Sequence, residues 1–489
     1  MNADADYVSE PERRVPVAAR VDVVVAGAGP AGFAAAVAAV RNGADVLLVE
    51  QANYVGGMLA SQAILGFYSY QGKQIIFGIP QELVDRLVAI GACAGHIPDP
   101  RLGSVTVTDV EMLKVTTQEM VAEAGAKLLL HTFVSAPVME GNTVKGIVIE
   151  NKSGRQAVLA RVVVDATGDA DVAARAHVPF EIKPKDAIQP GTLMFRMDHV
   201  DVDKIRLALA RDDDNAHMVP GFGSSAEYYL RAERFALDGF RSAVQQAREN
   251  GDLPPDYPQR WVIVATQPRE DEVFINMAMV TGFHAIDAWD FTRAEMEARR
   301  RVPIVVNFLK KYIPGFADAH LISTHNTIGI RESRRIVGDY VLTAEDVMQG
   351  RTFADGVAIA PWRPSMGHHP KGNFVDDPHG ERYPRRLVRG CEVPYGCLVP
   401  KDVQGLLVAG RAISATGEGQ NAIRVMAPCM SLGQAAGTAA ALAAREGITP
   451  RQLDGAKVRA ALVQQGVRFL DERSAAKPAS VPPVVARQQ

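Results

Sequence analysis

Three glycines and one acidic residue near the start of the chain have the residue types and spacing of a dinucleotide-binding site. Gly27, Gly29 and Gly32 follow the apolar residues 21–26, and Glu50 ends a second apolar run about twenty residues later. Gly27 permits a tight turn, Gly29 lets the backbone approach a pyrophosphate, and Gly32 lets a helix pack closely on a strand. A carboxylate at the place of Glu50 can accept hydrogen bonds from ribose hydroxyls. The pattern predicts an adenine dinucleotide, and therefore redox chemistry.

These residues need a strand, a turn and a helix to hold them. Residues 21–26 are apolar and β-branched, residues 31–41 are rich in small side chains, and residues 45–49 are again apolar. This order predicts a strand, a helix and a second strand, the βαβ unit in which a dinucleotide lies across the first turn. The unpaired N–H groups and the partial positive charge at the start of the helix would face the pyrophosphate.

Three later features favour FAD over NAD as the dinucleotide. A glycine pair in residues 55–61 follows Glu50 and Gln51, so the backbone there can approach a flat ring closely. Residues 161–176 hold an apolar run that ends in Ala-Thr-Gly-Asp. Residues 405–414 hold another that ends at a glycine, and a helix of small residues is expected after it, over about 422–445. Together with the first fingerprint, these features predict a flavoprotein.

Several longer blocks carry a family resemblance. They are the glycine fingerprint, the Ala-Thr-Gly-Asp strand end, and the runs GIRESRRIVGDYVLT, PYGCLVP, LLVAGRAISAT and RVMAPCMSLGQAAGTAAAL. In these blocks the chain resembles the FAD-dependent oxidoreductases of the glutathione-reductase-like flavoprotein superfamily. More narrowly, it resembles a bacterial FAD-dependent oxidoreductase family related to the fumarate reductase flavoproteins. The resemblance extends over roughly residues 20–470, and the last three blocks are the most specific.

The resemblance assigns parts of FAD to particular residues. It implies that the fingerprint and the acid after it bind the ADP half, that Val134 meets the adenine, and that residues 167–169 line the ADP and pyrophosphate side. It also implies that residues 56–58 lie beside the isoalloxazine and residues 410–411 beside the ribityl chain and the pyrophosphate. Residues 424–430 would bring a helix N-terminus toward the N1–C2=O edge, where its dipole stabilises the reduced anionic flavin. The expected cofactor contacts are Gly27, Gly29, Gly32, Glu50, Gln51, Gly56, Gly57, Met58, Val134, Thr167, Gly168, Asp169, Gly410, Arg411 and Arg424.

The order of apolar segments predicts an α/β fold in which one domain is inserted into another. A parallel sheet with a β-meander would form a Rossmann-like FAD-binding domain, and an inserted α+β substrate domain would cap it. Two long helices, over residues 226–250 and 291–313, are expected in the inserted domain. The expected divisions are a flexible arm over residues 1–19, the FAD-binding domain over 20–180 and 390–470, the substrate or cap domain over 181–389, and a tail over 471–489.

The sequence contains no second dinucleotide fingerprint. Residues 221–225 read GFGSS but follow no strand, so we do not expect them to bind a nicotinamide cofactor. No two cysteines form a Cys-x-x-Cys, so we expect neither a redox pair nor metal ligands. Cys429, at an expected helix start, is interpreted as a buried apolar residue in preference to a reactive thiol. The flavin must therefore exchange electrons with the substrate and with an external donor or acceptor.

The charge and the distribution of apolar residues limit the kinds of partner that we expect for the chain. The chain has 53 basic and 56 acidic residues and a net charge of −3, which argues against a nucleic-acid surface. No apolar run approaches the roughly eighteen residues that span a membrane, and the N-terminus lacks the pattern of a signal peptide. These features predict a reduced cytoplasmic protein that acts on a small molecule. A homo-oligomer is left open.

Arg331 is the first candidate for the chemistry on the substrate. With Arg334 and Arg335 it forms the densest cationic cluster, and it could bind a substrate carboxylate or stabilise negative charge in the transition state. The alternative is that these arginines hold the two domains together through ion pairs with acids such as Glu332 and Asp339.

Two histidines are candidates for moving a proton. His325 lies on an expected strand whose alternation would put it on one face with Thr327 and Arg331. His369, next to His368, lies in a Gly/Pro-rich segment of the kind that closes over sites. The alternatives are a hydrogen-bonded structural histidine for the first and a solvated loop for the second.

The favoured hypothesis is an FAD-dependent oxidoreductase. Hydride would pass between flavin N5 and a small polar substrate, a carboxylate being one option, with Arg331 holding the anion and His325 or His369 handling the proton. The direction of the reaction is left open. The alternatives are a flavin-dependent monooxygenase, a desulfurising or other non-classical flavoenzyme, and a non-enzymatic FAD-binding protein.

Overall fold

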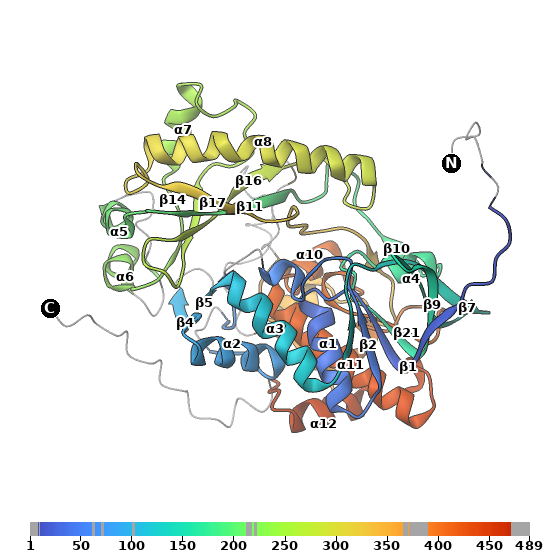
Figure 1. The fold of residues 1–489 in the computed structure, drawn as a ribbon. Coiled ribbons are helices and arrows are strands. Elements are labelled where there is room, and N and C mark those ends of the chain that lie inside the picture. Colours follow the sequence, from blue (N-terminus) through green and yellow to red (C-terminus); the bar gives the residue numbers. More distant parts are fainter. Residues whose placement is uncertain are drawn as a thin grey trace.

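The chain forms two stacked bodies, a lower α/β domain and an upper domain that lies over it (Figure 1). This computed structural model describes residues 8, 10–60, 64–69, 73–99, 103–211, 218–219, 223–364, 370 and 390–470. Within that part of the chain, no helix is long and apolar enough to cross a membrane.

The lower domain is built on a sheet of seven strands in the described part of the chain, in the order β6-β2-β1-β9-β8-β7 with β21 also paired to β9. Strands β6, β2, β1, β9 and β21 run parallel, and β7 and β8 add the antiparallel meander. This is the predicted parallel sheet with a meander. The strands are β1 (Val17–Ala26), β2 (Val46–Val49), β6 (Lys127–Leu129), β7 (Phe133–Glu140), β8 (Thr143–Asn151), β9 (Gly154–Asp165) and β21 (Leu406–Val408).

Two helices made largely of small residues lie against each other on this sheet. They are α1 (Pro30–Arg41) and α11 (Met426–Glu446), and both are almost entirely buried. A β-carbon added at Gly433 or Gly437 would overlap the carbonyl oxygen of Ala31 or Ala35, so only glycine permits this spacing. The remaining helices of the lower domain are α2 (Ile79–Ala89), α3 (Val110–Ala124), α4 (Asp171–Arg175), α9 (Ala344–Gln349), α10 (Gly417–Asn421) and α12 (Gly455–Gln464).

The upper domain is an antiparallel sheet covered by one long helix. Its strand order is β14-β15-β16-β11-β17. Helix α8 (Ala288–Tyr312) packs on β16 and β11, and residues from Leu193 to Ile328 form a hydrophobic core separate from that of the lower domain. The elements are β11 (Gly191–Asp198), α5 (Val202–Arg211), β12 (Met218–Val219), β13 (Gly223–Ser224), α6 (Ser225–Arg231), β14 (Ala236–Gly239), α7 (Arg241–Glu249), β15 (Val262–Thr266), β16 (Val273–Val280), α8 and β17 (His320–Thr324).

Short pairings complete the described structure. One small sheet has the order β3-β5-β4, and two-stranded pairs join β10 to β18 and β19 to β20. These strands are β3 (Ile64–Leu65), β4 (Cys93–Asp99), β5 (Gly103–Thr108), β10 (Phe180–Glu181), β18 (Arg335–Ile336), β19 (Gly356–Ala360) and β20 (Cys391–Pro394).

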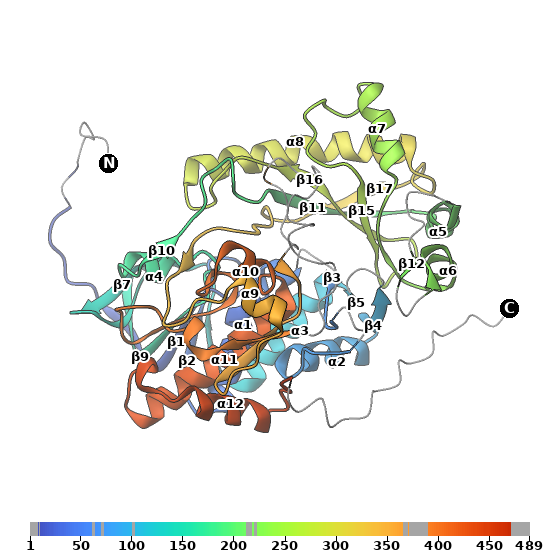
Figure 2. The same ribbon diagram turned by 180° about the vertical axis from the view of Figure 1, so that it is seen from behind.

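Two predicted boundaries are wrong. Residues 17–19, expected in the flexible arm, belong to β1, where Val17 pairs with Ala157 of β9. The chain also returns to the lower domain before residue 390. Figure 2 shows α9 beside α10 in the lower body, and Leu342, Val347 and Val357 belong to the core that contains α1 and α11. Local composition cannot show where the chain returns to the lower domain, because the domain of a segment depends on which hydrophobic core its side chains join.

The long helix predicted over residues 226–250 is also wrong. The segment forms α6, then β14, then α7. Phe240 has φ 58°, a left-handed conformation that no continuous right-handed helix can contain. Strand β14 pairs with β15, so a sheet partner outside the segment overrides its helical pattern. The helix predicted over residues 291–313 is confirmed as α8.

Candidate functional site

The glycine turn lies at the carboxyl end of β1, as the fingerprint predicts. Gly27 has φ 92°, and its N–H donates to the Val49 carbonyl at 2.8 Å, which ties the turn to the end of β2. Gly29 is the N-cap of α1, and a β-carbon there would meet no atom within 4 Å. A β-carbon on Gly32 would overlap the carbonyl oxygen of Gly27. The space beside Gly29 at a helix N-terminus suits a pyrophosphate.

Glu50 is buried and holds the turn from the second strand. Its two carboxylate oxygens accept hydrogen bonds from the N–H groups of Ala28 at 2.6 Å and Ala52 at 2.8 Å. An ionised carboxylate has about four acceptor positions, so Glu50 keeps capacity for ribose hydroxyls while fixing the loop.

A cavity of about 260 Å³ opens beside this turn. It lies between the ends of the parallel strands and the upper domain. It is lined by Gly27, Gly29, Pro30, Val49, Glu50, Gln51, Ala52, Tyr54, Gly57, Met58, Thr132, Phe133, Val134, Ala166, Thr167, Gly168, Asp169, Asp171, Phe291, His325, Thr327, Ile328, Ile330 and Arg411. The structure therefore gathers most of the predicted cofactor residues, and His325 with them, around one cavity.

Arg411 forms the cationic side of the cavity. Its Nη2 donates to Asp169 Oδ1 at 2.7 Å, and its Nε is buried without a hydrogen-bond acceptor in the described residues. Gly168 has φ 85°, and a β-carbon there would lie 2.9 Å from the guanidinium. These three residues follow the ends of β9 and β21, which pair side by side, so the fold brings them together. An N–H without an acceptor beside a polar cavity fits an anionic diphosphate.

Four predicted cofactor residues do not line the cavity. Gly32 and Gly410 lie where backbone segments meet, and a β-carbon on Gly410 would be 3.2 Å from that of Ala31. The N–H of Gly56 donates to the Ala28 carbonyl at 2.8 Å, so the glycine pair joins the fingerprint turn. Arg424 lies just before α11, which begins at Met426, four residues later than the expected start near 422.

His325 meets a tyrosine at the cavity wall. Its Nδ1 lies 2.8 Å from the Thr327 carbonyl and 3.3 Å from the Thr327 nitrogen, and the shorter contact, to an oxygen that can only accept, assigns the proton to Nδ1. Its Nε2, 3.4 Å from the Tyr54 hydroxyl, is then an acceptor. Burial lowers the pKa of His325 below its ordinary value, so the neutral ring is favoured. The arrangement provides a base that can take up a proton at Nε2.

The strand face expected to hold His325, Thr327 and Arg331 together is wrong. Strand β17 ends at Thr324, and Arg331 does not line the cavity that His325 and Thr327 line. Arg331 is buried, and its Nη1 donates to the Pro190 carbonyl at 2.7 Å and to Thr192 Oγ1 at 2.8 Å. The chain bulges out of the ladder after His325 and pairs with β11 again at Gly329, opposite Thr192, so the alternation of an unbroken strand does not apply.

Arg331 is a buried cation with no carboxylate within ion-pair distance in the described residues. Burial first, and then the charge of Arg424, lower the pKa of Arg331 to about 9. Burial first, and then the charge of Arg411, lower the pKa of Arg424 to about 10, against the opposing effects of Glu332 and Cys429. The charge of Arg411, at the cavity, therefore acts on Arg424, and the charge of Arg424 acts on Arg331.

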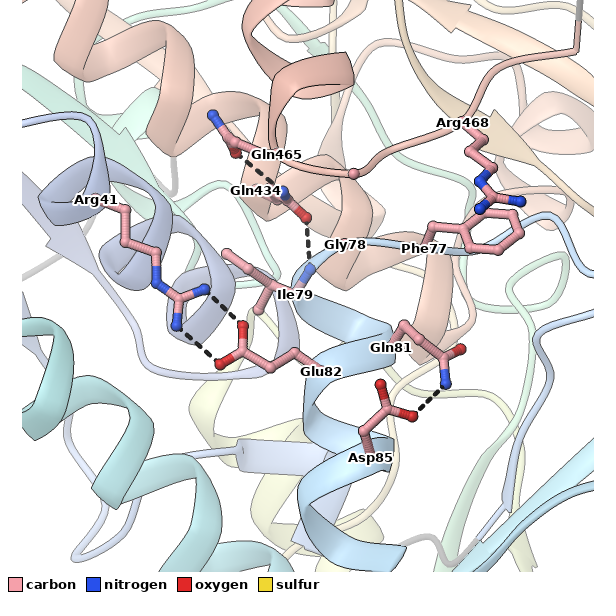
Figure 3. Close-up of a pocket in the computed structure, with 11 residues that line it drawn as sticks. Arg41, Phe77, Gly78, Ile79, Gln81, Glu82, Asp85, Gln434, Gln465 and Arg468 are labelled. Carbon is pink, nitrogen blue, oxygen red and sulfur yellow. Dashed lines mark hydrogen bonds and ion pairs between the residues drawn. The ribbon is translucent and has the colours of Figure 1, made fainter. Parts of the chain in front are cut away.

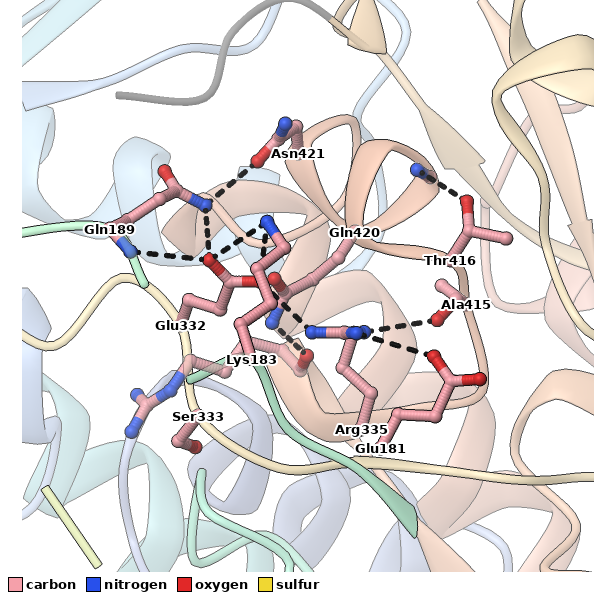
Figure 4. Close-up of polar contacts among 12 residues, drawn as sticks. Glu181, Lys183, Gln189, Glu332, Ser333, Arg335, Ala415, Thr416, Gln420 and Asn421 are labelled. Atoms are coloured by element: carbon pink, nitrogen blue, oxygen red, sulfur yellow. Dashed lines mark hydrogen bonds and ion pairs between the residues drawn. The ribbon is translucent and has the colours of Figure 1, made fainter. Parts of the chain in front are cut away.

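The neighbouring arginines form ion pairs, as the structural alternative proposed. Glu332 is fully buried, and its oxygens accept from Arg335 Nη1 at 2.9 Å and pair with Lys183 Nζ at 2.9 Å (Figure 4). Arg335 also donates through Nε to the Ala415 carbonyl at 3.2 Å. Arg334 pairs with Asp171 at 3.0 Å. These contacts connect the linker after the cap to the lower domain and satisfy both arginines.

His369 and the cysteines take no part in the cavity as the structure describes it. His369 lies outside the described residues, so the structure does not place it. All four cysteines are buried and free, and burial raises the pKa of Cys429 to about 12, so none is an activated thiolate.

Sequence reasoning missed Tyr54, Thr132, Phe133 and Phe291 at the cavity. Only Tyr54, between the ribose acid and the glycine pair, had a local signal.

A second cavity, of about 430 Å³, lies away from the fingerprint turn (Figure 3). The carbonyl oxygen of the Gln434 side chain accepts from the Ile79 N–H at 2.9 Å, and Arg41 pairs with Glu82 at 2.6 Å. This cavity includes none of the predicted cofactor or catalytic residues. Its larger volume therefore does not make it the dinucleotide site.

Comparisons with known proteins agree with the dinucleotide geometry. The model of the family described as FAD dependent oxidoreductase matches residues 22–462. A thiamine thiazole synthase from Aeropyrum pernix is 33% identical over 169 residues, which are 32% of this chain and 57% of that protein. A digeranylgeranylglycerophospholipid reductase from Methanosarcina acetivorans is 28% identical over 186 residues, which are 34% of this chain and 42% of that protein. The matches thus span about half the length of these relatives.

Solved structures with a similar chain course are more distant. A geranylgeranyl bacteriochlorophyll reductase-like protein from Thermoplasma acidophilum has a TM-score of 0.46 and 14% identity, over 91% of this chain and 84% of that one. A flavin-dependent brominase has a TM-score of 0.44 and 13% identity, over 91% and 83%. Such distant likenesses carry no information about the substrate.

Proposed function

The chain belongs to the family of FAD-dependent oxidoreductases, and from this premise we propose that it transfers hydride between flavin N5 and a small polar substrate that carries a carboxylate. FAD, when bound, supplies the hydride chemistry, and the protein supplies binding, orientation and charge. The glycine turn, Glu50 and Arg411 fit the ADP half of FAD, because they offer an open helix N-terminus, a ribose acceptor and a partly unsatisfied cation. The remaining roles concern the substrate.

The observation that carries the substrate proposal is the buried charge of Arg331. Burying a cation without a partner is unfavourable, and a carboxylate can offset that penalty through two charge-assisted hydrogen bonds. The charge of Arg424 adds to the effect of burial on Arg331, so an anion bound beside Arg331 would offset both. Thr192 orients Arg331 from the cap, so a substrate there would lie between the two domains.

His325 is our proposed proton carrier. Because its ring is neutral and its Nε2 accepts, it can take a proton from a substrate hydroxyl, or from Tyr54 in a relay. Tyr54 is half-buried, and burial raises the pKa of its hydroxyl, so it stays protonated and serves as a donor. His369 remains a second candidate for this step.

The proposal is tested by an anaerobic screen of paired substrates. Holoenzyme is mixed with small hydroxy or amino carboxylates and with the matching amides, and the visible flavin absorbance is followed; reduced enzyme is screened with unsaturated acids in parallel. We expect absorbance changes with carboxylates and at least about tenfold slower changes with amides, since an amide offers Arg331 no charge. Equal rates would refute the anion site. If instead a substrate is hydroxylated only when oxygen and NADPH are supplied, the monooxygenase alternative is established.

The partners we propose are a small-molecule substrate and an external electron donor or acceptor. Among the described residues the fingerprint turn of β1 is the single Rossmann-type turn that leads into a helix N-cap glycine, so a nicotinamide cofactor would have to bind elsewhere. The cytoplasmic location, the absence of nucleic-acid binding, a homo-oligomeric state and kinship with fumarate reductase flavoproteins remain predictions from the sequence. The desulfurising and non-enzymatic alternatives have no supporting contact in the site.

A further inference from the structure

We propose that Asp198, His199 and His320 form a binding site for a divalent transition-metal ion on the cap domain. The site lies where β11 ends and β17 begins. It is separate from the proposed function and from the flavin cavity. No cysteine takes part, so the cysteine spacing that predicted no metal ligands does not bear on it.

The sheet brings two of the three residues together. Strands β11 and β17 are antiparallel neighbours, and Asp198 is the registered partner of His320. Side chains of registered partners project from the same face of a sheet with their β-carbons about 5 Å apart. The carboxylate and the first imidazole are therefore juxtaposed by the fold, independently of any rotamer.

His199 is brought to the other two residues by an unusual backbone conformation. Successive strand residues point to opposite faces, so His199 would normally point away from Asp198. His199 instead has φ 54°, in the left-handed region that non-glycine residues occupy at an energetic cost. Its N–H donates to Asp271 Oδ2 at 3.4 Å, which helps to hold the turn. The reversal returns its ring to the carboxylate.

The donor atoms are close to the spacing that an ion requires. Asp198 Oδ1 lies 3.0 Å from His199 Nδ1 and 3.9 Å from His320 Nδ1, and one possible ligand atom from each residue lies within 4.8 Å of the others. Two ligands at about 2.1 Å from one ion are at most about 4.2 Å apart, so a small side-chain movement suffices. Oδ1 is buried and meets no donor in hydrogen-bond geometry among the described residues. It is available as a ligand.

The ligand chemistry selects the kind of ion. Two imidazoles and one carboxylate suit Zn²⁺, Ni²⁺ or Co²⁺ better than Mg²⁺ or Ca²⁺, which prefer all-oxygen sets. Both imidazoles are exposed, so water can complete the coordination. His325 follows the opposite end of β17, roughly 17 Å away at about 3.4 Å per residue, so the ion would cross-link two cap strands without touching the flavin cavity.

The test uses the FAD-loaded protein and Zn²⁺ alone. Isothermal titration should show one ion per chain, with affinity at least about tenfold weaker in His320→Ala and in His199→Gly. Glycine accepts φ 54° without strain, so the second variant removes a ligand while keeping the turn. The matched control is His177→Gly, since His177 is also exposed and has φ 62° but lies outside the cluster.

Thermal unfolding with and without Zn²⁺ separates binding from folding. Wild type and His177→Gly should melt at a higher temperature with Zn²⁺, and His199→Gly should melt at the wild-type apo temperature or above, with no response to Zn²⁺. The proposal is overturned if wild type takes up no Zn²⁺, or if all four proteins bind it equally.

Discussion

Arg331 and Arg335 are four residues apart and both buried, yet their surroundings give them opposite roles. Arg335 has a buried carboxylate partner in Glu332, whereas Arg331 donates to uncharged oxygens. A buried ion pair that loses one member leaves an uncompensated charge. A buried cation without such a partner is already uncompensated, and its removal leaves no orphaned acid. The two arginines are therefore a matched pair for separating function from stability.

We predict that Arg335→Ala lowers the free energy of unfolding by about 3–5 kcal/mol, while Arg331→Ala changes it little or raises it. With the substrate found in the anaerobic screen, Arg331→Ala should raise KM by about tenfold or more and keep its FAD, because a charge-assisted contact is lost. Denaturant titration, bound-flavin absorbance and steady-state kinetics give the three readouts. Equal destabilisation by both changes would make Arg331 structural.

His96 provides a pH-dependent contribution to stability. Its Nε2 lies 2.9 Å from Gln81 Oε1 and its Nδ1 lies 2.7 Å from Thr106 Oγ1, so the neutral ring is satisfied on both sides. Burial lowers the pKa of His96 to about 4, against 6.5 for an unperturbed histidine. Between these pH values the unfolded chain binds a proton that the native chain does not.

Stability from this group is therefore complete above pH 6.5 and falls as the pH drops toward 4, with a slope of about 1.4 kcal/mol per pH unit. We predict that His96→Gln flattens that part of the profile. The measurement is the denaturation midpoint between pH 7 and pH 4.5 for both proteins. Parallel profiles would show that His96 does not titrate in this way.

At the scale of elements, the packing of α1 on α11 decides where the fingerprint turn lies. Gly433 packs on Ala31 in the first turn of α1, whose start is the proposed pyrophosphate site. Adding a methyl group there would push the helices apart, and overpacking of this kind costs about 1–3 kcal/mol or more. It would also displace the N–H groups at the start of α1 that we propose to face the dinucleotide.

We therefore predict that Gly433→Ala loses stability and FAD affinity together. Ser431→Ala is the control on the same helix, because its hydroxyl only donates back to the Ala427 carbonyl at 3.4 Å. Melting temperature and FAD dissociation are measured for both variants. A Gly433→Ala protein that melts normally and retains FAD would show that the helices can separate without cost.

The elements that sequence patterns predicted well are those with local signals. The fingerprint strands, the meander and α8 follow from apolar periodicity, and the N-cap Asp109 and C-cap Gly125 delimit α3 as helix-end preferences require. The elements that were missed depend on distant partners. Strand β14 exists because β15 pairs with it, and the chain after β17 bulges before Gly329 pairs again with Thr192 of β11.

The residues of the candidate site fall into the same two groups, those with a local sequence signal and those placed by distant partners. Glycines and Glu50 were predictable because backbone approach and ribose binding need those residue types at a set spacing. Phe291 was not, since the cap brings it to the cavity from a segment far along the chain. The different roles of Arg331 and Arg335 could not be predicted either, because burial and partners follow from the tertiary fold.

At the scale of the whole molecule, the cavity joins segments that are distant in the sequence. It is lined by the N-terminal βαβ unit, the end of β9, the start of the 3₁₀ turn after β21, and the cap residues His325 and Ile328. FAD bound there would contact both domains, so its binding energy would stabilise both. A ligand present at 100 times its dissociation constant adds about 2.7 kcal/mol to the free energy of unfolding.

We predict that FAD raises the melting temperature of both domains in one cooperative transition, whereas ADP, which fits only the fingerprint half, raises that of the lower domain alone. Calorimetry of apoprotein, ADP-loaded protein and holoenzyme measures this, with flavin release and tryptophan emission as separate probes. Trp261 and Trp289 belong to the cap and Trp362 to the lower domain, so single Trp→Phe variants assign each transition. If the cap melts at the same temperature with and without FAD, the cofactor does not bridge the domains, and the substrate site between them would have to form without its help.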